Sequence, residues 1–153
     1  MGLNIEISCN IPLASGLGSS AAFSSCLSAL VLTLDGRIDA SNFDNNLSLI
    51  NSWAFWIEHM FHGKPSGMDN TCVVYGGLIL YQSTRFEQIQ TDFFENIEFL
   101  VINTGKPKQT LNAVNSVLEL RNKFPDIIDG LFTTIDSITK EFVKGLGSEG
   151  TVS

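Results

Sequence analysis

Pro12-Leu-Ala-Ser-Gly16-Leu-Gly18-Ser19-Ser20-Ala-Ala22 is the stretch that decides the fold, because it is a glycine-rich turn between a predicted strand and a predicted helix. Before it, residues 3 to 8 alternate apolar and polar, with the two-residue period of a strand that buries one face. After it, residues 19 to 34 are small or apolar nearly all round, which predicts a buried helix ended by Asp35-Gly36.

This turn has the properties of an anion site. Glycines let the backbone approach a phosphate closely, and the start of the following helix offers unpaired N–H groups. The turn lacks the lysine of the G-x-x-x-x-G-K-[ST] loop and does not follow the dinucleotide pattern G-x-G-x-x-G. The hydroxyl of Ser20 could cap the helix or coordinate a phosphate-bound Mg²⁺. The alternative is a tight strand-to-helix turn with a purely structural role.

A second predicted helix carries a carboxylate on its apolar side. Its stripe consists of Ile50, Trp53, Ala54, Ile57 and Phe61. Glu58 follows Ala54 by four positions, so it should point toward the protein interior. Burying an ionised carboxylate is costly unless it meets a cation, and a Mg²⁺ shared with Ser20 would offset that cost. The alternative is a carboxylate at the edge of the stripe, solvated or paired with a nearby histidine.

A second carboxylate, Asp69, follows the turn Gly63-Lys-Pro-Ser-Gly67. Phosphoryl transfer uses a residue that orients the attacking hydroxyl and accepts its proton, and Asp69 is the candidate. The alternative is a helix N-cap. His59 and His62 lack a third ligand nearby, so we expect structural roles. Lys106 and Lys108 could face a phosphate or carboxylate, although a solvated turn is the simpler interpretation.

The remaining chain predicts several further elements. The runs at 73–75 and 78–81 around Gly76-Gly77 indicate a hairpin or bent strand, and residues 99–102 a short buried strand. Two helices follow, separated by Pro125. The small, polar tail at 145–153 should fray.

Composition narrows the class of protein. The chain has 153 residues, 44% of them hydrophobic, which is enough for about one globular domain. A net charge of -7 argues against nucleic acid or an anionic membrane as a partner. The sequence shows no secretory signal and no apolar run of about 20 residues, so we expect a cytoplasmic location. The cysteines, Cys9, Cys26 and Cys72, do not form a disulfide or zinc pattern and are expected in the core.

Residues 12–22, together with Trp53-Ala-Phe-Trp-Ile-Glu58-His-Met-Phe-His-Gly-Lys-Pro-Ser-Gly-Met-Asp69-Asn70, resemble the galactokinase, homoserine kinase, mevalonate kinase and phosphomevalonate kinase superfamily, and specifically its mevalonate kinase branch. The segment 103–110 is similar to it as well. The resemblance implies that ATP phosphates are bound by Ala14, Ser15, Gly16, Leu17, Gly18, Ser19 and Ser20. It also implies that Ser20 and Glu58 hold Mg²⁺, that Asp69 is the base toward the 5-hydroxyl of mevalonate, and that Thr110 borders the substrate. Lys108 stands where the family usually shows arginine.

The same resemblance implies an α+β, two-domain small-molecule kinase fold. Residues 1–95 would be the end of a ribosomal protein S5 domain 2-like N-terminal domain, and residues 96–153 the start of a ferredoxin-like C-terminal domain. The family's N-terminal lysine motif and C-terminal glycine-rich motif are not found, so we expect a fragment, incomplete at both ends and inactive alone.

The expected activity of the complete protein is phosphorylation of mevalonate to 5-phosphomevalonate with ATP and Mg²⁺, a step of isoprenoid and sterol precursor biosynthesis, in a protein that could be a homodimer. Two alternatives stay open. One is a sibling kinase that acts on another small alcohol or on phosphomevalonate. The other is a noncatalytic binding or regulatory protein made from a truncated product.

Overall fold

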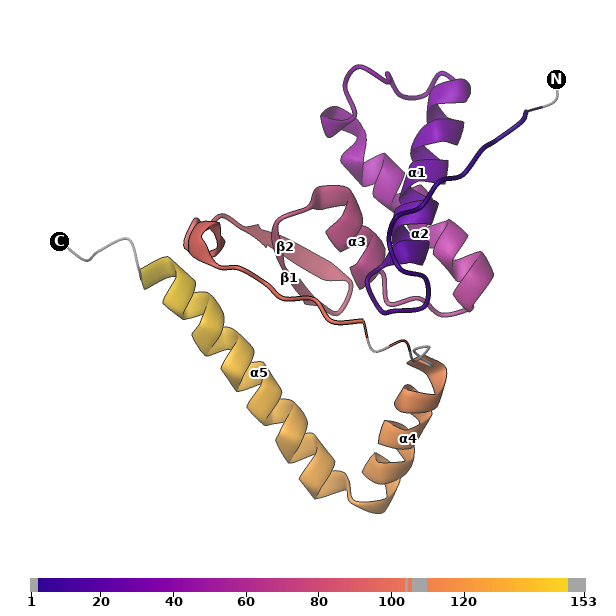
Figure 1. The fold of residues 1–153 in the computed structure, drawn as a ribbon. Helices are drawn as coiled ribbons and strands as arrows, with labels where there is room; N and C mark the ends of the chain where they lie inside the picture. Colours follow the sequence, from indigo (N-terminus) through magenta and orange to yellow (C-terminus); the bar gives the residue numbers. More distant parts are fainter. Residues whose placement is uncertain (1–2, 104, 106–109, 149–153) are drawn as a thin grey trace. The chain divides into compact units, whose positions relative to one another are not determined.

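A computed structural model describes residues 3–103, 105 and 110–148 (Figure 1). The chain divides into two compact units. The first unit comprises Met1–Gln90 and Ile102–Lys106, and the second comprises Thr91–Val101 and Pro107–Ser153. The described structure is mixed α+β, mostly helical with one small hairpin. No helix within the described ranges is long and apolar enough to cross a membrane.

The first unit is built around helix α1 (Ser19–Leu34), as the sequence predicts. Its N-cap is Gly18 in the left-handed conformation, and Asp35 ends it. Leu32, fully buried near the end of α1, forms the core with Ile38 and Ile50. The partly buried hydrophobic residues packed against this core are Ala29, Leu49, Trp53 and Val74. The core therefore lies where α1 meets the following helices.

Helix α2 (Leu47–His62) follows a short 3-10 helix, η1 (Asp44–Asn46), and packs on α1 (Figure 1). The predicted stripe holds in its middle, where Ile50, Ala54 and Glu58 are buried. It fails at its end, because Phe61 is largely exposed, although its ring meets that of Phe23 edge to face with centroids 6.2 Å apart.

The hairpin lies later in the chain than the sequence predicts. Residues 73–75 belong to helix α3 (Met68–Tyr75), which ends at Gly76. Strands β1 (Leu78–Gln82) and β2 (Arg85–Ile89) form an antiparallel pair in which Leu78 faces Ile89. Ser83 and Thr84 make the turn with positive φ angles. The β-branched run at the end of α3 is helical because Val74 packs into the core, which outweighs its local preference for a strand.

Two predicted strands do not form. Residues 3–10 are irregular, with Leu3, Ile5 and Ile7 exposed, and residues 99–102 are also irregular and exposed. The β1–β2 pair is the only ladder within the described residues. An alternating or apolar pattern gives a strand only where another strand supplies hydrogen bonds, and neither segment has such a neighbour there.

The second unit contains η2 (Phe93–Asn96) and helices α4 (Thr110–Lys123) and α5 (Pro125–Ser148). The two predicted helices are confirmed, and Pro125 occupies the first position of α5, where its missing N–H costs nothing. Residues 145–148, predicted to fray, continue α5, while 149–153 lie outside the described residues. Phe93 contacts Phe142 edge to face, at 6.3 Å between ring centroids.

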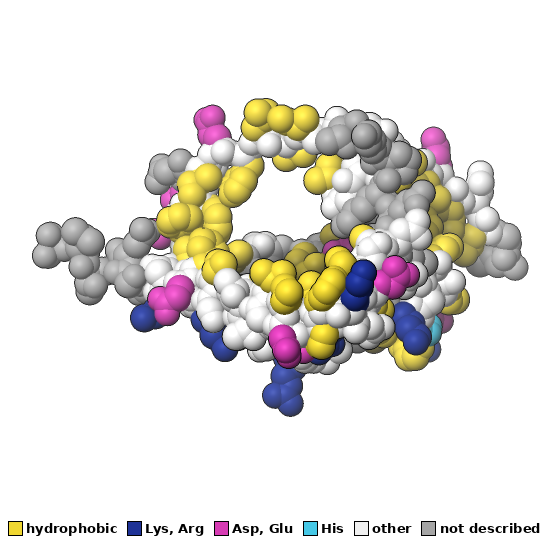
Figure 2. All heavy atoms as spheres, turned by 90° about the horizontal axis from the view of Figure 1, so that it is seen from below, with side chains coloured by type: hydrophobic (Ala, Val, Ile, Leu, Met, Phe, Trp, Pro, Cys, Tyr) yellow, Lys and Arg dark blue, Asp and Glu magenta, His cyan; other side chains and the backbone are white. Residues whose placement is uncertain are grey.

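Most of the apolar face of α5 is exposed. The side chains on it that are more than half exposed are Ile127, Leu131, Ile135 and Ile138. Figure 2 shows apolar side chains gathered in patches on the face of the molecule that it displays.

Candidate functional site

The glycine turn presents the start of α1 without a side-chain cap. Ala14, Gly16 and Gly18 all have positive φ angles, and the side chain of Ser15 donates a hydrogen bond to the carbonyl of Pro12 at 2.7 Å. Within the part of the chain that the structure describes, no side chain caps the start of α1. The capping alternative for Ser20 is therefore wrong. Uncapped N–H groups at a helix start are suited to donating hydrogen bonds to a phosphate.

The structure brings Glu58 of α2 to α1, as its place on the stripe predicts. The residue is 5% exposed. Its Oε2 atom accepts a hydrogen bond from Ser20 Oγ at 3.3 Å, and its Oε1 atom accepts one from Ser24 Oγ at 2.7 Å. Two residues that lie 38 positions apart in sequence are thus in contact at the start of α1.

Ser24 is the residue that sequence reasoning missed. It is fully buried and makes the shorter of the two serine bonds to Glu58. The signal was present, because Ser20, Ser24 and Ser28 recur every four residues and so share one face of the helix. Ser28 donates to the backbone carbonyl of Ser24 at 2.7 Å. This hydroxyl row in a largely apolar helix indicated a polar contact.

Glu58 also lies beside a histidine, which is the alternative that the sequence left open. His62 Nε2 lies 3.5 Å from Glu58 Oε2, one helical turn further along α2, and the His62 side chain is about half exposed. His59 stacks on Phe55 and meets Trp56 edge-on. The described residues contain no cluster of three or more His, Cys, Asp or Glu side chains that could hold a metal.

The geometry of the Ser20–Glu58 pair fits a Mg²⁺ ion. In octahedral coordination with Mg–O distances of about 2.0–2.1 Å, neighbouring ligand oxygens lie about 2.9 Å apart. Ser20 Oγ and Glu58 Oε2 are 3.3 Å apart, close to that value. Mg²⁺ usually retains several waters and takes few protein ligands beside phosphate oxygens, so two protein ligands suffice. The carboxylate could also supply the negative charge that such an ion needs.

Asp69 occupies the second position of α3 and is exposed. The N-cap of that helix is Gly67, so the N-cap alternative for Asp69 is wrong. No hydrogen bond or ion pair among the described residues joins Asp69 to Ser20 or Glu58. A Cβ atom built on Gly18 would lie 3.8 Å from Val73, which is one helical turn beyond Asp69. The end of the glycine turn therefore lies against α3, the helix that carries Asp69.

Buried polar contacts fix the start of α3 on α2. Asn70 donates to the side-chain oxygen of Asn51 at 2.6 Å, and Asn51 donates to Thr71 Oγ1 at 3.2 Å. Thr71 Oγ1 in turn donates to the carbonyl of Gly67 at 2.6 Å. A Cβ on Gly67, whose φ is +83°, would come within 2.8 Å of the Tyr81 hydroxyl. Gly67, two positions before Asp69, and Asn70, directly after it, are thus both held by close contacts.

The carboxylate of Asp69 also affects the thiol of Cys72. Partial burial, and then the Asp69 charge, raise the pKa of Cys72 above its ordinary value. Burial, and then Cys72, likewise raise the pKa of Tyr81, whose hydroxyl donates to the carbonyl of Ser66 at 2.7 Å.

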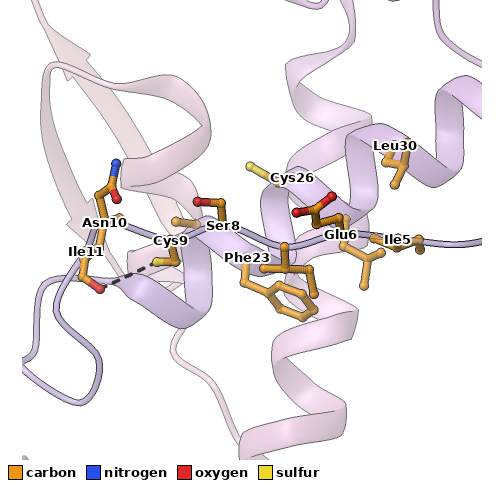
Figure 3. Close-up of a pocket in the computed structure, with 12 residues that line it drawn as sticks. Ile5, Glu6, Ser8, Cys9, Asn10, Ile11, Phe23, Cys26 and Leu30 are labelled. Carbon is orange, nitrogen blue, oxygen red and sulfur yellow. Dashed lines mark hydrogen bonds between the residues drawn. The ribbon is translucent and has the colours of Figure 1, made fainter.

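An apolar groove lies on another face of α1. It has a volume of about 360 Å³ and runs between the irregular segment 5–11 and the side chains of Phe23, Cys26 and Leu30 (Figure 3). It contains none of the predicted site residues. Cys26 lines it, and Cys9 and Cys72 are exposed as well, so the expectation that the cysteines lie in the core is wrong. All three are free thiols.

Three predicted positions lie wholly or partly outside the described residues. Lys106 and Lys108 lie outside the described residues. Thr110 is the first residue of α4, but its side chain lies outside them.

Comparison with known proteins identifies the family. The family described as "GHMP kinases N terminal domain" matches residues 1–77, which include the glycine turn, Ser20, Glu58 and Asp69. The chain belongs to the GHMP kinase family. Among curated proteins, it is 38% identical to mevalonate kinase of Bos taurus over 154 aligned residues, and 36% identical to that of Homo sapiens over 157. It is 35% identical to the mevalonate kinase of Schizosaccharomyces pombe.

These matches cover nearly all of the chain but a smaller part of the relatives. The alignments include 95% to 97% of the chain and 38% to 39% of the three relatives. The chain therefore spans about two fifths of the length of the curated relatives that it matches.

Proposed function

We propose that this chain forms part of an enzyme that transfers the γ-phosphoryl group of ATP to the 5-hydroxyl of mevalonate, giving 5-phosphomevalonate and ADP. The observation that carries the proposal is the contact between Ser20, at the uncapped start of α1, and the buried carboxylate of Glu58. The mevalonate kinases of three organisms, which share about a third of their aligned residues with the chain, support this choice of substrate.

The phosphates of ATP would lie against residues 14–20. There the backbone N–H groups at the start of α1 and the helix dipole favour negative charge. Ser20 and Glu58 would hold the Mg²⁺ of the nucleotide, which supplies charge neutralisation when bound. With a net charge of -7, the chain gives a nucleotide little long-range attraction, so local donors and the ion must provide it.

Asp69 would act as the base toward the substrate. It would accept the proton of the 5-hydroxyl as that oxygen bonds to the γ-phosphorus and the bond to the ADP oxygen breaks. The exposed position of Asp69 on α3 leaves it accessible to a small alcohol, and the buried turn before it fixes its backbone. Thr110 would border the substrate, by resemblance alone.

The same proposal includes a two-domain architecture, with an N-terminal domain similar to domain 2 of ribosomal protein S5 ending near residue 95. A ferredoxin-like domain would begin near residue 96. The proposed activity belongs to the complete protein, because the chain spans only about two fifths of its relatives.

The decisive experiment is an assay of the complete protein that follows ADP release with mevalonate, phosphomevalonate, galactose and homoserine as separate acceptors. We expect turnover with mevalonate, and a loss of kcat of about 10²–10⁴-fold in Asp69→Asn. Asp44→Asn, on the exposed 3-10 helix η1, is the control and should retain full kcat. A preference for another acceptor would overturn the choice of substrate, and an active Asp69→Asn variant would overturn the choice of base.

A further inference from the structure

The two carboxylate oxygens of Glu58 have different surroundings. Oε2 faces Ser20 and His62, both of which reach solvent. Oε1 faces Ser24, whose side chain is fully buried and whose bond, at 2.7 Å, is clearly shorter than the 3.3 Å bond from Ser20. One oxygen is therefore held inside the protein, and the other is presented at the start of α1.

We propose that Ser24 is a positioning residue that fixes the orientation of the Glu58 carboxylate and thereby directs Oε2 toward the metal site. The inference rests on the proposed function, because it concerns the same Mg²⁺ site. Ser24 itself would touch neither metal nor nucleotide.

The reason lies in the softness of the last glutamate torsion. Rotation of a carboxylate about χ3 has broad, roughly two-fold minima, so packing of the side-chain stem does not fix where the two oxygens point. A hydrogen bond to an ionised acceptor is stronger than a neutral one and shorter. The Ser24 hydroxyl, held on a helix that packs directly on α2, can select one orientation.

Burial makes this bond difficult to replace. Ser24 is 0% exposed and Glu58 is 5% exposed, so water has little access to Oε1 if the hydroxyl is removed. The carboxylate would then turn to satisfy that oxygen, and Oε2 would leave its position beside Ser20. Partners that orient metal ligands in this way typically contribute 10- to 100-fold to metal affinity.

The chain offers a matched control at the neighbouring position. The Ser25 side chain is also buried, and its hydroxyl has no hydrogen-bond partner within the described structure. Ser25→Ala therefore removes the same group from the same helix without touching Glu58. Any general effect of losing a buried hydroxyl from α1 appears in both variants, whereas an effect transmitted through the carboxylate appears only in Ser24→Ala.

The test is titration of the complete protein with Mn²⁺, a paramagnetic substitute for Mg²⁺, with and without ATP. Affinity is measured from the electron paramagnetic resonance signal of free Mn²⁺, and location from broadening of the Ser20 and Glu58 amide signals in NMR. We expect about a 10- to 100-fold weaker affinity in Ser24→Ala and less than a twofold change in Ser25→Ala. Ser24→Thr, which keeps a hydroxyl, should retain more affinity than Ser24→Ala.

The outcomes separate the two levels of the proposal. If the unmodified complete protein binds Mn²⁺ without broadening the Ser20 and Glu58 signals, or does not bind it, the metal site of the proposed function is wrong. If it binds there and Ser24→Ala weakens binding no more than Ser25→Ala, only the role of Ser24 is wrong. If Ser24→Ala does not fold, the Ser24→Thr variant tests the role of Ser24 instead. An affinity for Mn²⁺ equal to that of the unmodified protein would support that role. A hundredfold loss of affinity, despite the retained hydroxyl, would contradict it.

Discussion

Helices α2 and α5 carry similar apolar stripes but differ in what covers them. The middle of the α2 stripe is buried against α1 and α3, and it includes the polar contacts of Glu58 and Asn51. The stripe of α5 is largely exposed within the described structure, with Phe142 meeting Phe93 near its end. The difference teaches that helical periodicity identifies the face to be covered but not the element that covers it.

The largest effect that tests this comparison is expected from core truncation. Leu32→Ala should lower the free energy of unfolding by about 2–5 kcal/mol, because it leaves a cavity beside Ile38 and Ile50. Ile135→Ala, on the exposed stripe of α5, should change it by less than about 0.5 kcal/mol. Urea unfolding of both variants measures the contrast. Equal losses would show that the α5 face is covered in solution and would remove the distinction between the two helices.

A smaller effect is expected at the turn between α2 and α3. Gly67→Ala should cost about 2–3 kcal/mol, because a left-handed backbone disfavours any Cβ and this one would displace the Tyr81 hydroxyl from the Ser66 carbonyl. Gly36→Ala is the matched control, because Gly36 is also left-handed but has nothing within 4 Å of the added Cβ, and it should cost about 1–2 kcal/mol. Thermal unfolding of the two variants measures the difference. Identical losses would mean that the contact with Tyr81 contributes nothing.

The polar part of the α2 contact should contribute less. Asn70→Ala leaves the Asn51 side-chain oxygen without its 2.6 Å donor and should cost about 1–2 kcal/mol. Asn45→Ala, exposed on η1, should cost less than about 0.5 kcal/mol. Besides the free energy of unfolding, hydrogen exchange of the α3 amides can be measured. Loosening of this helix should raise their exchange rates in Asn70→Ala but not in Asn45→Ala. Unchanged exchange would place the stabilisation elsewhere.

The sequence predicted those features that depend on the pattern of neighbouring residues. The limits of α1, the inward direction of Glu58 and its meeting with Ser20 followed from periodicity and from the need of a buried carboxylate for a partner. The two helices around Pro125 followed in the same way. In each case the pattern of nearby residues is sufficient, because side chains three or four positions apart lie on the same face of a helix.

Features that depend on distant partners were missed. Segments 3–8 and 99–102 have strand-like patterns, but a strand also requires a neighbour with which to pair. Residues 73–75 are helical because Val74 contacts a core assembled from α1 and α2. The spacing of Ser20, Ser24 and Ser28 marked a polar face of α1, but the role of Ser24 depends on Glu58, 34 positions away, meeting that face. The domain boundary near residue 95 and the metal and base roles stay predictions.

The smallest expected effect concerns the exposed side of α3, and it is electrostatic. Partial burial and the Asp69 carboxylate raise the pKa of Cys72 above its ordinary value of 9.0, so less of the reactive thiolate is present at a given pH. Asp69→Asn removes the negative charge that disfavours the thiolate, which lowers the pKa. At pH 8 the rate of Cys72 alkylation by iodoacetamide should therefore rise by about two- to fivefold, because a solvent-screened charge pair shifts a pKa by less than about one unit.

Mass spectrometry of the peptide that contains Cys72 measures this rate across pH 7 to 10, and Asp44→Asn serves as the control for a lost charge elsewhere. The difference between Asp69→Asn and the unmodified chain should vanish above the raised pKa, where the thiol is ionised in both. Added salt should also reduce it, since the carboxylate is exposed. A rate at pH 8 that is the same in both proteins would mean that Asp69 points away from Cys72. The side chain proposed as the base would then face a different part of the α3 surface from the one that the present geometry indicates.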